Sequence, residues 1–255
     1  MALTKIETSN LADDAVDIAQ LGATGTADAT TFLRGDNAWA SAGGGFLGTV
    51  VYTATGTYTP GATTNGTAGD EGSTTVSKIV VEVQSAGGGS GSNSATANSG
   101  GPGGGGAYAL KVLDIGTDRS VITTCTATVG AAGAAASYVS AQPGAAGGAS
   151  SFAKTTGSGS FTTVTAAGGL GGANNTYTPG DFTAVPTTGD INIAGSKGTS
   201  YGVTQVAGGD SKFGWGGRGN PSSGTGYGVG GMCSSGSYVN GTVGKDGIVV
   251  IWEYA

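Results

Sequence analysis

Histidine is absent from this sequence, and charged side chains of either sign are scarce. Asp, Glu, Lys and Arg make up 10% of the residues, and the formal net charge is −6. Without histidine, imidazole catalysis and histidine-based zinc sites are excluded. A groove for nucleic acid needs clustered Lys and Arg, which an acidic chain with so few cations does not offer. We therefore expect no nucleic-acid partner.

Cysteine and long apolar runs are also scarce. The only cysteines are Cys125 and Cys233, whose spacing fits no metal site, and we expect neither a metal nor a cofactor. Cys125 lies in an alternating run and is expected as a small buried strand residue, with a Cys125–Cys233 disulfide as the alternative. No stretch approaches the roughly 18 apolar residues of a membrane span, and the N-terminus lacks the apolar core of a secretory leader.

Glycine is what the sequence has in excess. It occupies 54 of 255 positions, whereas an ordinary protein has about 7%. So much glycine opposes helix formation and favours a mainly β chain. Disordered chains combine low hydrophobicity with high net charge, but 37% of this chain is hydrophobic. We therefore expect most of the glycines to hold fixed backbone positions.

Alternating apolar and polar residues predict short strands throughout residues 46–255. The predicted strands are Leu47–Thr59, Ser77–Ser85, Tyr108–Ile115, Val121–Val129, Ser151–Lys154, Phe161–Ala166, Asp190–Ala194 and Gly247–Tyr254. Short strands with long links predict a mainly β fold, an antiparallel β-sandwich or jelly-roll-like domain with long glycine-rich loops.

Finer expectations concern which side chains lie inside this domain. Residues 79–83 are apolar on both faces and are expected as a central strand. Tyr108, Leu110 and Val112 fall on one apolar face of their strand. Trp252, on the last strand, is expected in the core.

The predicted loops 86–106, 130–150, 167–180 and 195–246 contain most of the glycine runs. They have no strict three-residue period, which excludes a collagen helix. Two uses of these glycines stay open. They can supply positive φ angles in tight turns, or they can allow close, polyglycine-type packing of extended polyproline-like segments.

Residues 1–21 have a different pattern, typical of a short helix with Asn10 as its cap. One apolar stripe is expected to dock or to trimerise the chain, and its residues are Leu3, Ile6, Leu11, Ala15, Ile18 and Leu21. An isolated helix of this length is marginal in water, so the stripe needs a partner. The partner is the same stripe of neighbouring subunits, a larger assembly, or this chain's own domain. Residues 22–45 are an extended connector.

No motif in the sequence indicates an enzyme. The glycine runs lack the Gly-Lys-Ser/Thr ending and the strand–helix context of a nucleotide-binding loop. Paired carboxylates can hydrolyse glycosidic bonds without histidine, but no spacing here places two acids across a cleft. Most of the aspartates occupy turn positions, where their side chains bond the local backbone. We therefore expect no catalytic residues.

Aromatic residues inside the glycine-rich segments are the candidate binding residues. Tyr and Trp flanked by Gly, Ser and Asn resemble binding loops, in which rigid rings supply contact area. The low charge suits a neutral polysaccharide, whose sugar rings stack on such faces. The alternative is that these rings fill space between glycine segments. The candidates are Trp215, Tyr227, Tyr201, Tyr177, Tyr138 and Tyr238, with Trp215 and Tyr227 the strongest.

The N-terminal part of the chain resembles bacteriophage tail-fibre proteins. Residues 27–40, ADATTFLRGDNAWA, are similar to a connector in many phage fibres, where Thr-Phe-Leu-Arg-Gly-Asp is followed by a Trp. The stretches LTKI at 3–6 and LADDAV at 11–16 resemble the N-termini of fibre proteins from marine and cyanobacterial phages.

Residues 46–255 are similar to the glycine-rich domain that ends some of these fibres. The resemblance rests on YTATGTYTP at 52–60, IVVEV at 79–83 and GGGGAYA at 103–109. The chain departs from the family in having almost no shaft between its N-terminal stretch and its terminal domain.

The resemblance implies a virion tail-fibre protein, assembled in the host cytoplasm, as a short fibre or fibre tip. The implied partners are two further copies in a homotrimer, tail or baseplate proteins at the N-terminus, and a host polysaccharide or outer-membrane receptor. The alternative is a purely structural virion component, in the baseplate or as a capsid appendage or decoration protein. A carbohydrate-degrading spike is a third class.

Overall fold

The computed structural model describes residues 31–33, 39–41, 45–61, 76–93, 100–115, 122–139, 142–176, 178–181, 185–201, 205–217, 224–233 and 238–255. The chain divides into two compact units, Met1–Gly45 and Phe46–Ala255. In the first unit, β1 (Thr31–Leu33) pairs antiparallel with β2 (Trp39–Ser41). The helix predicted within residues 1–21, with its six-residue stripe, lies outside the described residues.

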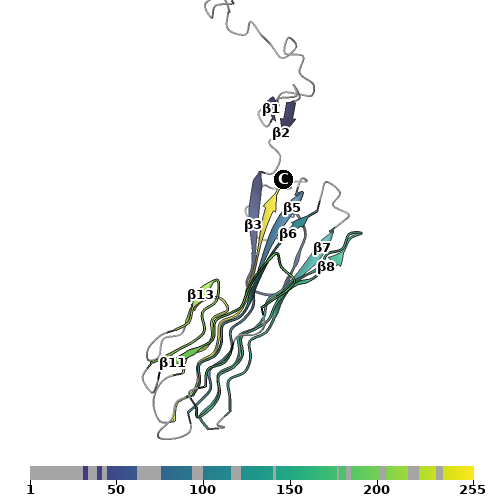
Figure 1. The fold of residues 1–255 in the computed structure, drawn as a ribbon. Coiled ribbons are helices and arrows are strands. Elements are labelled where there is room, and N and C mark those ends of the chain that lie inside the picture. The colour runs from purple at the N-terminus through teal and green to yellow at the C-terminus, as the bar shows by residue number, and fades with distance from the viewer. Residues whose placement is uncertain are drawn as a thin grey trace, which may run out of the picture. The chain divides into compact units, whose positions relative to one another are not determined.

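The second unit contains a five-stranded antiparallel sheet in the order β10-β6-β5-β15-β3 (Figure 1). Its strands are β3 (Phe46–Tyr52), β5 (Lys78–Gln84), β6 (Tyr108–Asp114), β10 (Ile191–Ile193) and β15 (Ile248–Tyr254). The run of apolar residues in β5 predicted a central strand, and this is confirmed.

A second antiparallel sheet has the order β4-β7-β8-β9. Its strands are β4 (Gly56–Tyr58), β7 (Thr124–Thr128), β8 (Ser150–Thr156) and β9 (Val164–Ala166). Two short hairpins complete the strands, β11 (Thr199–Tyr201) with β12 (Gln205–Ala207), and β13 (Gly214–Trp215) with β14 (Thr225–Gly226). The described residues contain no helix, and the predicted mainly β, antiparallel class is confirmed.

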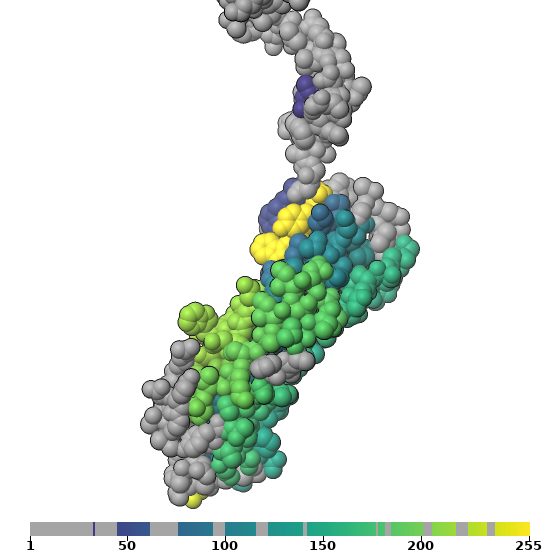
Figure 2. All heavy atoms as spheres, in the orientation of Figure 1, coloured from purple at the N-terminus to yellow at the C-terminus, as the bar shows by residue number. Residues whose placement is uncertain are grey.

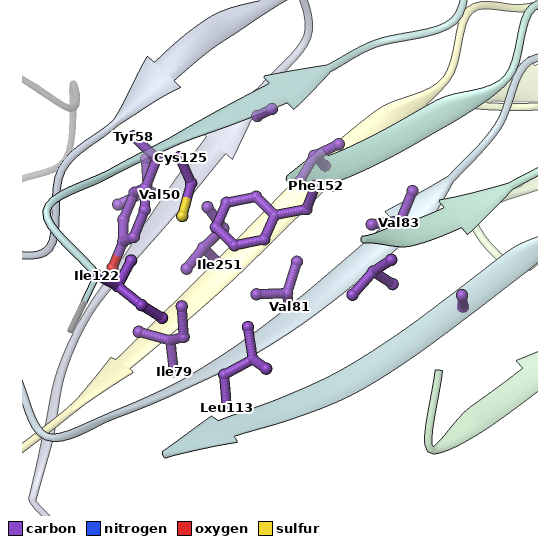
Figure 3. Packing of buried hydrophobic residues seen from close by; sticks show 14 of the residues in the cluster. Val50, Tyr58, Ile79, Val81, Val83, Leu113, Ile122, Cys125, Phe152 and Ile251 are labelled. Atoms are coloured by element: carbon purple, nitrogen blue, oxygen red, sulfur yellow. The ribbon is translucent and has the colours of Figure 1, made fainter. Parts of the chain in front are cut away.

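Buried residues from both sheets form one hydrophobic cluster (Figure 3). Tyr58 of β4 and Phe152 of β8 lie with ring centroids 5.7 Å apart, and Phe152 stacks on Phe161 at 5.8 Å. From the five-stranded sheet, Ile79 and Val81 point into the same cluster. Each such side chain contributes about 1.5–3 kcal/mol when it is fully buried.

Tyr108, Leu110 and Val112 share one face of β6 as predicted, but the cluster lies on the other face, and the core position expected for Trp252 is wrong. In β6, the cluster receives Ala109 and Leu113, whereas Val112 is 44% exposed on the other face. In β15, Ile251 is in the cluster, while Trp252 is half-buried on the other face. Both strands are apolar on both faces, so alternation alone does not tell which face is inside.

One carboxylate is buried at the edge of the cluster. Glu253 Oε1 accepts hydrogen bonds from the Tyr58 hydroxyl at 2.7 Å and from the backbone N–H of Gly61 at 2.9 Å. Burial, and then the charge of Glu253, raise the pKa of Tyr58 well above its usual range. Because a buried carboxylate needs donors, these two bonds keep Glu253 stable in the interior.

The two cysteines are reduced thiols buried in separate clusters. Cys125 lies in the main cluster, as predicted for a small strand residue, and burial raises its pKa to about 12. Cys233 packs with Val206 and Met232. The disulfide alternative is therefore not realised in this structure.

Several strands run directly into glycine-rich segments, which lie side by side as a long bundle (Figure 1). We call these segments the glycine bundle; they are residues 85–93, 100–107, 129–136, 142–149, 167–173, 194–198, 208–210, 228–233 and 241–247. Residues 86–91 lie within it and continue from β5. Apart from hairpins at its side, its described residues are not in strands, and they are joined by backbone hydrogen bonds.

The hydrogen bonds of residues 86–91 repeat every three residues, whereas those of a strand repeat every two. Successive N–H groups donate to three different segments, and the donor–acceptor pairs are Ala86–Gly148, Gly87–Lys245, Gly88–Gly104, Gly89–Ala145, Ser90–Thr242 and Gly91–Gly101. Their carbonyls accept from further segments, through Gly169, Gly133, Gly231, Gly172 and Ala136. One segment thus has bonded neighbours on every side.

This packing leaves no room for a side chain at the bundle's glycine positions. A Cβ atom on Gly87 would lie 1.9 Å from the carbonyl oxygen of Val229, and one on Gly91 would lie 1.9 Å from that of Ala173. Real Cβ atoms essentially never approach a backbone atom below 3.0 Å. The glycines at these positions are therefore required by the closeness of neighbouring backbones.

Gln84 marks the junction between sheet and bundle. Its side chain is fully buried, and Nε2 donates to the carbonyls of Gly106 at 2.9 Å and Ala107 at 3.0 Å. Its Oε1 accepts from the backbone N–H of Lys212 at 3.1 Å. The amide thus satisfies backbone groups where the two hydrogen-bond patterns meet.

Candidate binding surface on the glycine bundle

The end of the bundle remote from the sheets is defined by backbone pairing. Residues 85–93 leave β5 at Ser85 and reach Asn93, which exchanges two 3.0 Å backbone hydrogen bonds with Val239. Beside them, the N–H of Asn175 donates to the carbonyl of Ser92 at 3.0 Å. We call this region the remote end.

Tyr138 and Tyr238 come together at the remote end. Their ring centroids are 6.4 Å apart in an edge-to-face arrangement, and the side chains are 39% and 57% exposed. Val139, next to this pair, is 78% exposed. Edge-to-face contact stabilises aromatic pairs, so the two rings form a preorganised apolar surface, which we call the ledge.

A side-chain hydrogen bond and an unusual backbone conformation fix the positions of the two tyrosines. The side-chain oxygen of Asn240 accepts the N–H of Tyr138 at 3.0 Å, which ties the two tyrosine segments together. Tyr238 has a φ of 59°, a left-handed conformation that is rare for a bulky residue. Such strain costs on the order of 1–3 kcal/mol and persists only where surrounding contacts enforce it.

The chain around the remote end carries no charge. Residues 85–107, 130–150, 165–180 and 233–244 contain no Asp, Glu, Lys or Arg. The polar groups of these stretches are hydroxyls, amides and backbone. Such a surface recognises a neutral ligand by ring contact and hydrogen bonding, without a charge to neutralise.

Trp215, the strongest sequence candidate, is not part of this group. It is 75% exposed on β13, which lies along the side of the bundle (Figure 1). The neighbouring Gly216 donates to Asp210 Oδ1 at 2.6 Å, so this hairpin carries charge nearby.

Of the other candidates, Tyr227 is half-buried, and its N–H donates to the carbonyl of Phe213 at 3.2 Å. Phe213 itself packs edge-on against Tyr108 at 5.9 Å, so it fills space, as the alternative interpretation of the loop aromatics has it. Tyr201 ends β11, and Tyr177 lies outside the described residues.

Two of the acids considered for hydrolysis accept backbone N–H groups far from each other in the sequence. Asp246 accepts the N–H of Ala132 at 2.6 Å, and Asp190 accepts the N–H of Val112 at 2.8 Å. That bond, together with the Lys111 ammonium, lowers the pKa of Asp190. In the part of the chain that the structure describes, no three metal-ligating side chains gather into a site.

Sequence reasoning named both tyrosines but did not pair them. It missed Val139 and Asn240 altogether. A signal was present, because the tripeptide Ser-Tyr-Val occurs at residues 137–139 and again at 237–239. The structure brings the tyrosines of these two copies together at the remote end.

No protein-family model and no curated protein sequence matches the chain. Across the described ranges, no helix has the length and hydropathy needed to span a bilayer.

Proposed function

We propose that this protein is a phage virion tail-fibre protein, a short fibre or fibre tip, that binds a host surface glycan through the remote end of the glycine bundle. The observation that carries the proposal is the exposed Tyr138–Tyr238 pair on an uncharged surface. Tyrosine faces pack against the C–H faces of pyranose rings, and the neighbouring amides and hydroxyls bond sugar hydroxyls.

The architecture supports this role. The two sheets form a β-sandwich or jelly-roll-like base, and the bundle is a polyglycine-type array that acts as a stiff arm. The three-residue hydrogen-bond repeat of residues 86–91 is the period of a polyproline-type helix. A rigid arm keeps the ligand-binding residues preorganised, which lowers the entropy cost of binding.

The N-terminal stripe completes the proposal as the assembly element. Leu3, Ile6, Leu11, Ala15, Ile18 and Leu21 would join three copies or dock on tail or baseplate proteins. A single aromatic ledge binds sugars weakly, and several copies on one particle raise the overall affinity by avidity. The protein acts by adhesion and carries out no reaction.

Binding of the purified full chain to host cells tests the proposal. We expect the double variant Tyr138→Ala and Tyr238→Ala to lose binding at least about tenfold, since two ring contacts of about 1 kcal/mol each are removed. Trp215→Ala is the matched control, because it also removes an exposed ring, from the β13 hairpin beside the bundle. It should bind like the unaltered chain.

Other outcomes separate the remaining candidates. Equal binding by the tyrosine variant, with loss in Trp215→Ala, would move the site to the β13 hairpin. No binding by the unaltered chain to any host cell or surface polysaccharide would favour a structural virion component. Release of reducing sugar from host polysaccharide would show a degrading spike.

A further inference from the structure

The five-stranded sheet has a second face, away from the hydrophobic cluster. Residues directly opposite in register share a face. One cross-strand row on this face is Ile191, Leu110, Glu82, Val250 and Val51. The next row is Val112, Val80, Trp252 and Thr49. We call these two rows, with Phe46 and Tyr254 beside them, the outer face.

The outer face is largely apolar and, except for the buried Val250, at least partly exposed. Ile191 is 51% exposed, Val51 49% and Val112 44%. Phe46 is 57% exposed and packs on Trp252 and Tyr254, with ring centroids 6.0 and 5.9 Å apart. Figure 2 shows β3, β15, β5 and β6 side by side on one surface in purple, yellow and blue. Solvent-facing positions of a sheet normally carry polar side chains.

The one carboxylate in these two rows is already satisfied. Glu82 accepts hydrogen bonds from the Tyr108 hydroxyl on Oε2 and from Trp252 Nε1 on Oε1, each at 2.7 Å. A carboxylate with two side-chain donors loses less on leaving water than a bare one. Glu82 therefore does not prevent the face from being covered.

The dimensions of the face suit a protein partner. Five strands and two to three rows span about 24 Å by about 20 Å, on the order of 450 Å² of flat area. Patches of roughly 300–600 Å² are the largest that monomers commonly expose, and they are often functional. Two such faces together give about 900 Å², close to the roughly 1,000 Å² of the smallest specific interfaces.

The charged residues beside the outer face indicate which partner covers it. Exposed Lys78 lies directly opposite exposed Asp114 on the neighbouring strand, next to Tyr254. A surface with one cation and one anion side by side complements itself when two copies meet across a two-fold axis. Since the rest of the face is uncharged or satisfied, no like charges are brought together.

We infer that the outer face is an interface with a second copy of this chain, formed by face-to-face packing of the two five-stranded sheets. Valine, isoleucine and aromatic side chains of the two copies interdigitate, as in packed sheets about 10 Å apart. The contact is isologous and closes at a pair. It uses none of the residues of the N-terminal stripe.

The test is the solution mass of the full chain by light scattering, at 24.2 kDa per copy. We expect an even number of copies in the unaltered chain. The single variants Val51→Glu and Ile191→Glu should each halve the mass, because each places one glutamate from either copy inside the interface. Val243→Glu is the matched control, since Val243 is 55% exposed and lies outside the face. It should leave the mass unchanged.

A monomer or a trimer for the unaltered chain, up to about 100 μM, would overturn the inference, because an interface with a Kd in the micromolar range is populated at that concentration. An even-numbered assembly whose mass is the same in both face variants would also overturn it. If either glutamate variant is unfolded by circular dichroism, Val51→Thr and Ile191→Thr replace the pair. These keep strand propensity and should raise the concentration at which the mass halves.

Discussion

The sheets and the glycine bundle belong to one unit but are stabilised in different ways. The sheets are held by side chains, with Tyr58, Phe152 and Ile79 fully buried between them. The bundle is held by main chain, with N–H groups of residues 86–91 bonded to several neighbouring segments. Its interior is mainly backbone, with a few buried side chains such as Ser90 and Met232, where the sheets have a large hydrophobic cluster.

The difference shows how a chain can form an ordered arm with few large side chains. Glycine loses more conformational freedom on folding than any other residue. The bundle offsets this loss with hydrogen bonds in several directions, each worth about 0.5–1.5 kcal/mol net. The sheets also act as a template, because β5, β6 and β15 deliver their segments already aligned.

The largest expected effect is on the side-chain-stabilised part. Phe152→Ala removes a fully buried ring that contacts Tyr58 and Phe161, and we expect a loss of about 3–5 kcal/mol in the free energy of unfolding. Urea unfolding followed by circular dichroism measures it. A loss below about 1 kcal/mol would mean that the hydrophobic cluster does not stabilise the two sheets.

Adding one methyl group inside the bundle should lower the free energy of unfolding nearly as much as Phe152→Ala does. We expect Gly87→Ala to cost about 3 kcal/mol, because its Cβ would overlap the carbonyl of Val229 at 1.9 Å. Gly45→Ala is the control, since nothing lies within 4 Å of a Cβ there. Equal urea midpoints for the two variants would contradict close backbone packing in the bundle.

The buried hydroxyl of Tyr58 gives an intermediate effect that depends on pH. Tyr58→Phe removes one of the two hydrogen bonds to Glu253 described above and leaves the one from the Gly61 N–H. We expect the free energy of unfolding to fall by about 1–3 kcal/mol at pH 7. Because the folded-state pKa of Tyr58 is raised, its contribution is fully present below the ordinary value of 10.0 and is lost as pH rises above it.

Unfolding measured from pH 7 to 11 checks the sign. Stability of the unaltered chain should fall above pH 9, where Cys125, with its pKa raised to about 12, also begins to contribute to the loss. The difference in the free energy of unfolding between the unaltered chain and Tyr58→Phe should become smaller above pH 10. A gap that widens with pH would show that the hydroxyl is not buried as a donor.

The smallest effect is expected for a large side chain on the bundle. Leu170 is 42% exposed, while its backbone lies among the bundle segments. We expect Leu170→Ala to change the free energy of unfolding by less than about 0.5 kcal/mol, as for ordinary surface positions. A loss above 2 kcal/mol, typical of a core leucine, would show that side chains hold the bundle as well.

Most strands of the two sheets could be predicted from alternation, because that pattern is local, but the predicted strand Leu47–Thr59 is divided into β3 and β4, which lie in different sheets. Which face is buried could not be predicted, since β6 and β15 are apolar on both faces and the choice depends on the second sheet. Trp252 was wrongly expected in the core for this reason. The outer face was missed with it.

The sequence predicted the close packing of the bundle only as one of two alternatives for its glycines, the other being positive φ angles in tight turns. Its three-residue repeat lies in hydrogen bonds between distant segments such as 86–91 and 101–104, and no sequence period records it. The Tyr138–Tyr238 contact likewise joins residues a hundred positions apart. The repeated Ser-Tyr-Val was its only local sign.

Amide hydrogen exchange of the native chain tests most directly the claim that main chain holds the bundle. The N–H groups of Gly88, Gly104 and Gly172 donate to carbonyls at 2.9, 2.8 and 2.9 Å. These amides should be protected as strongly as those of β5, opening only with the whole unit. Exchange within seconds at these glycines, with β5 still protected, would contradict a bundle held by its backbone.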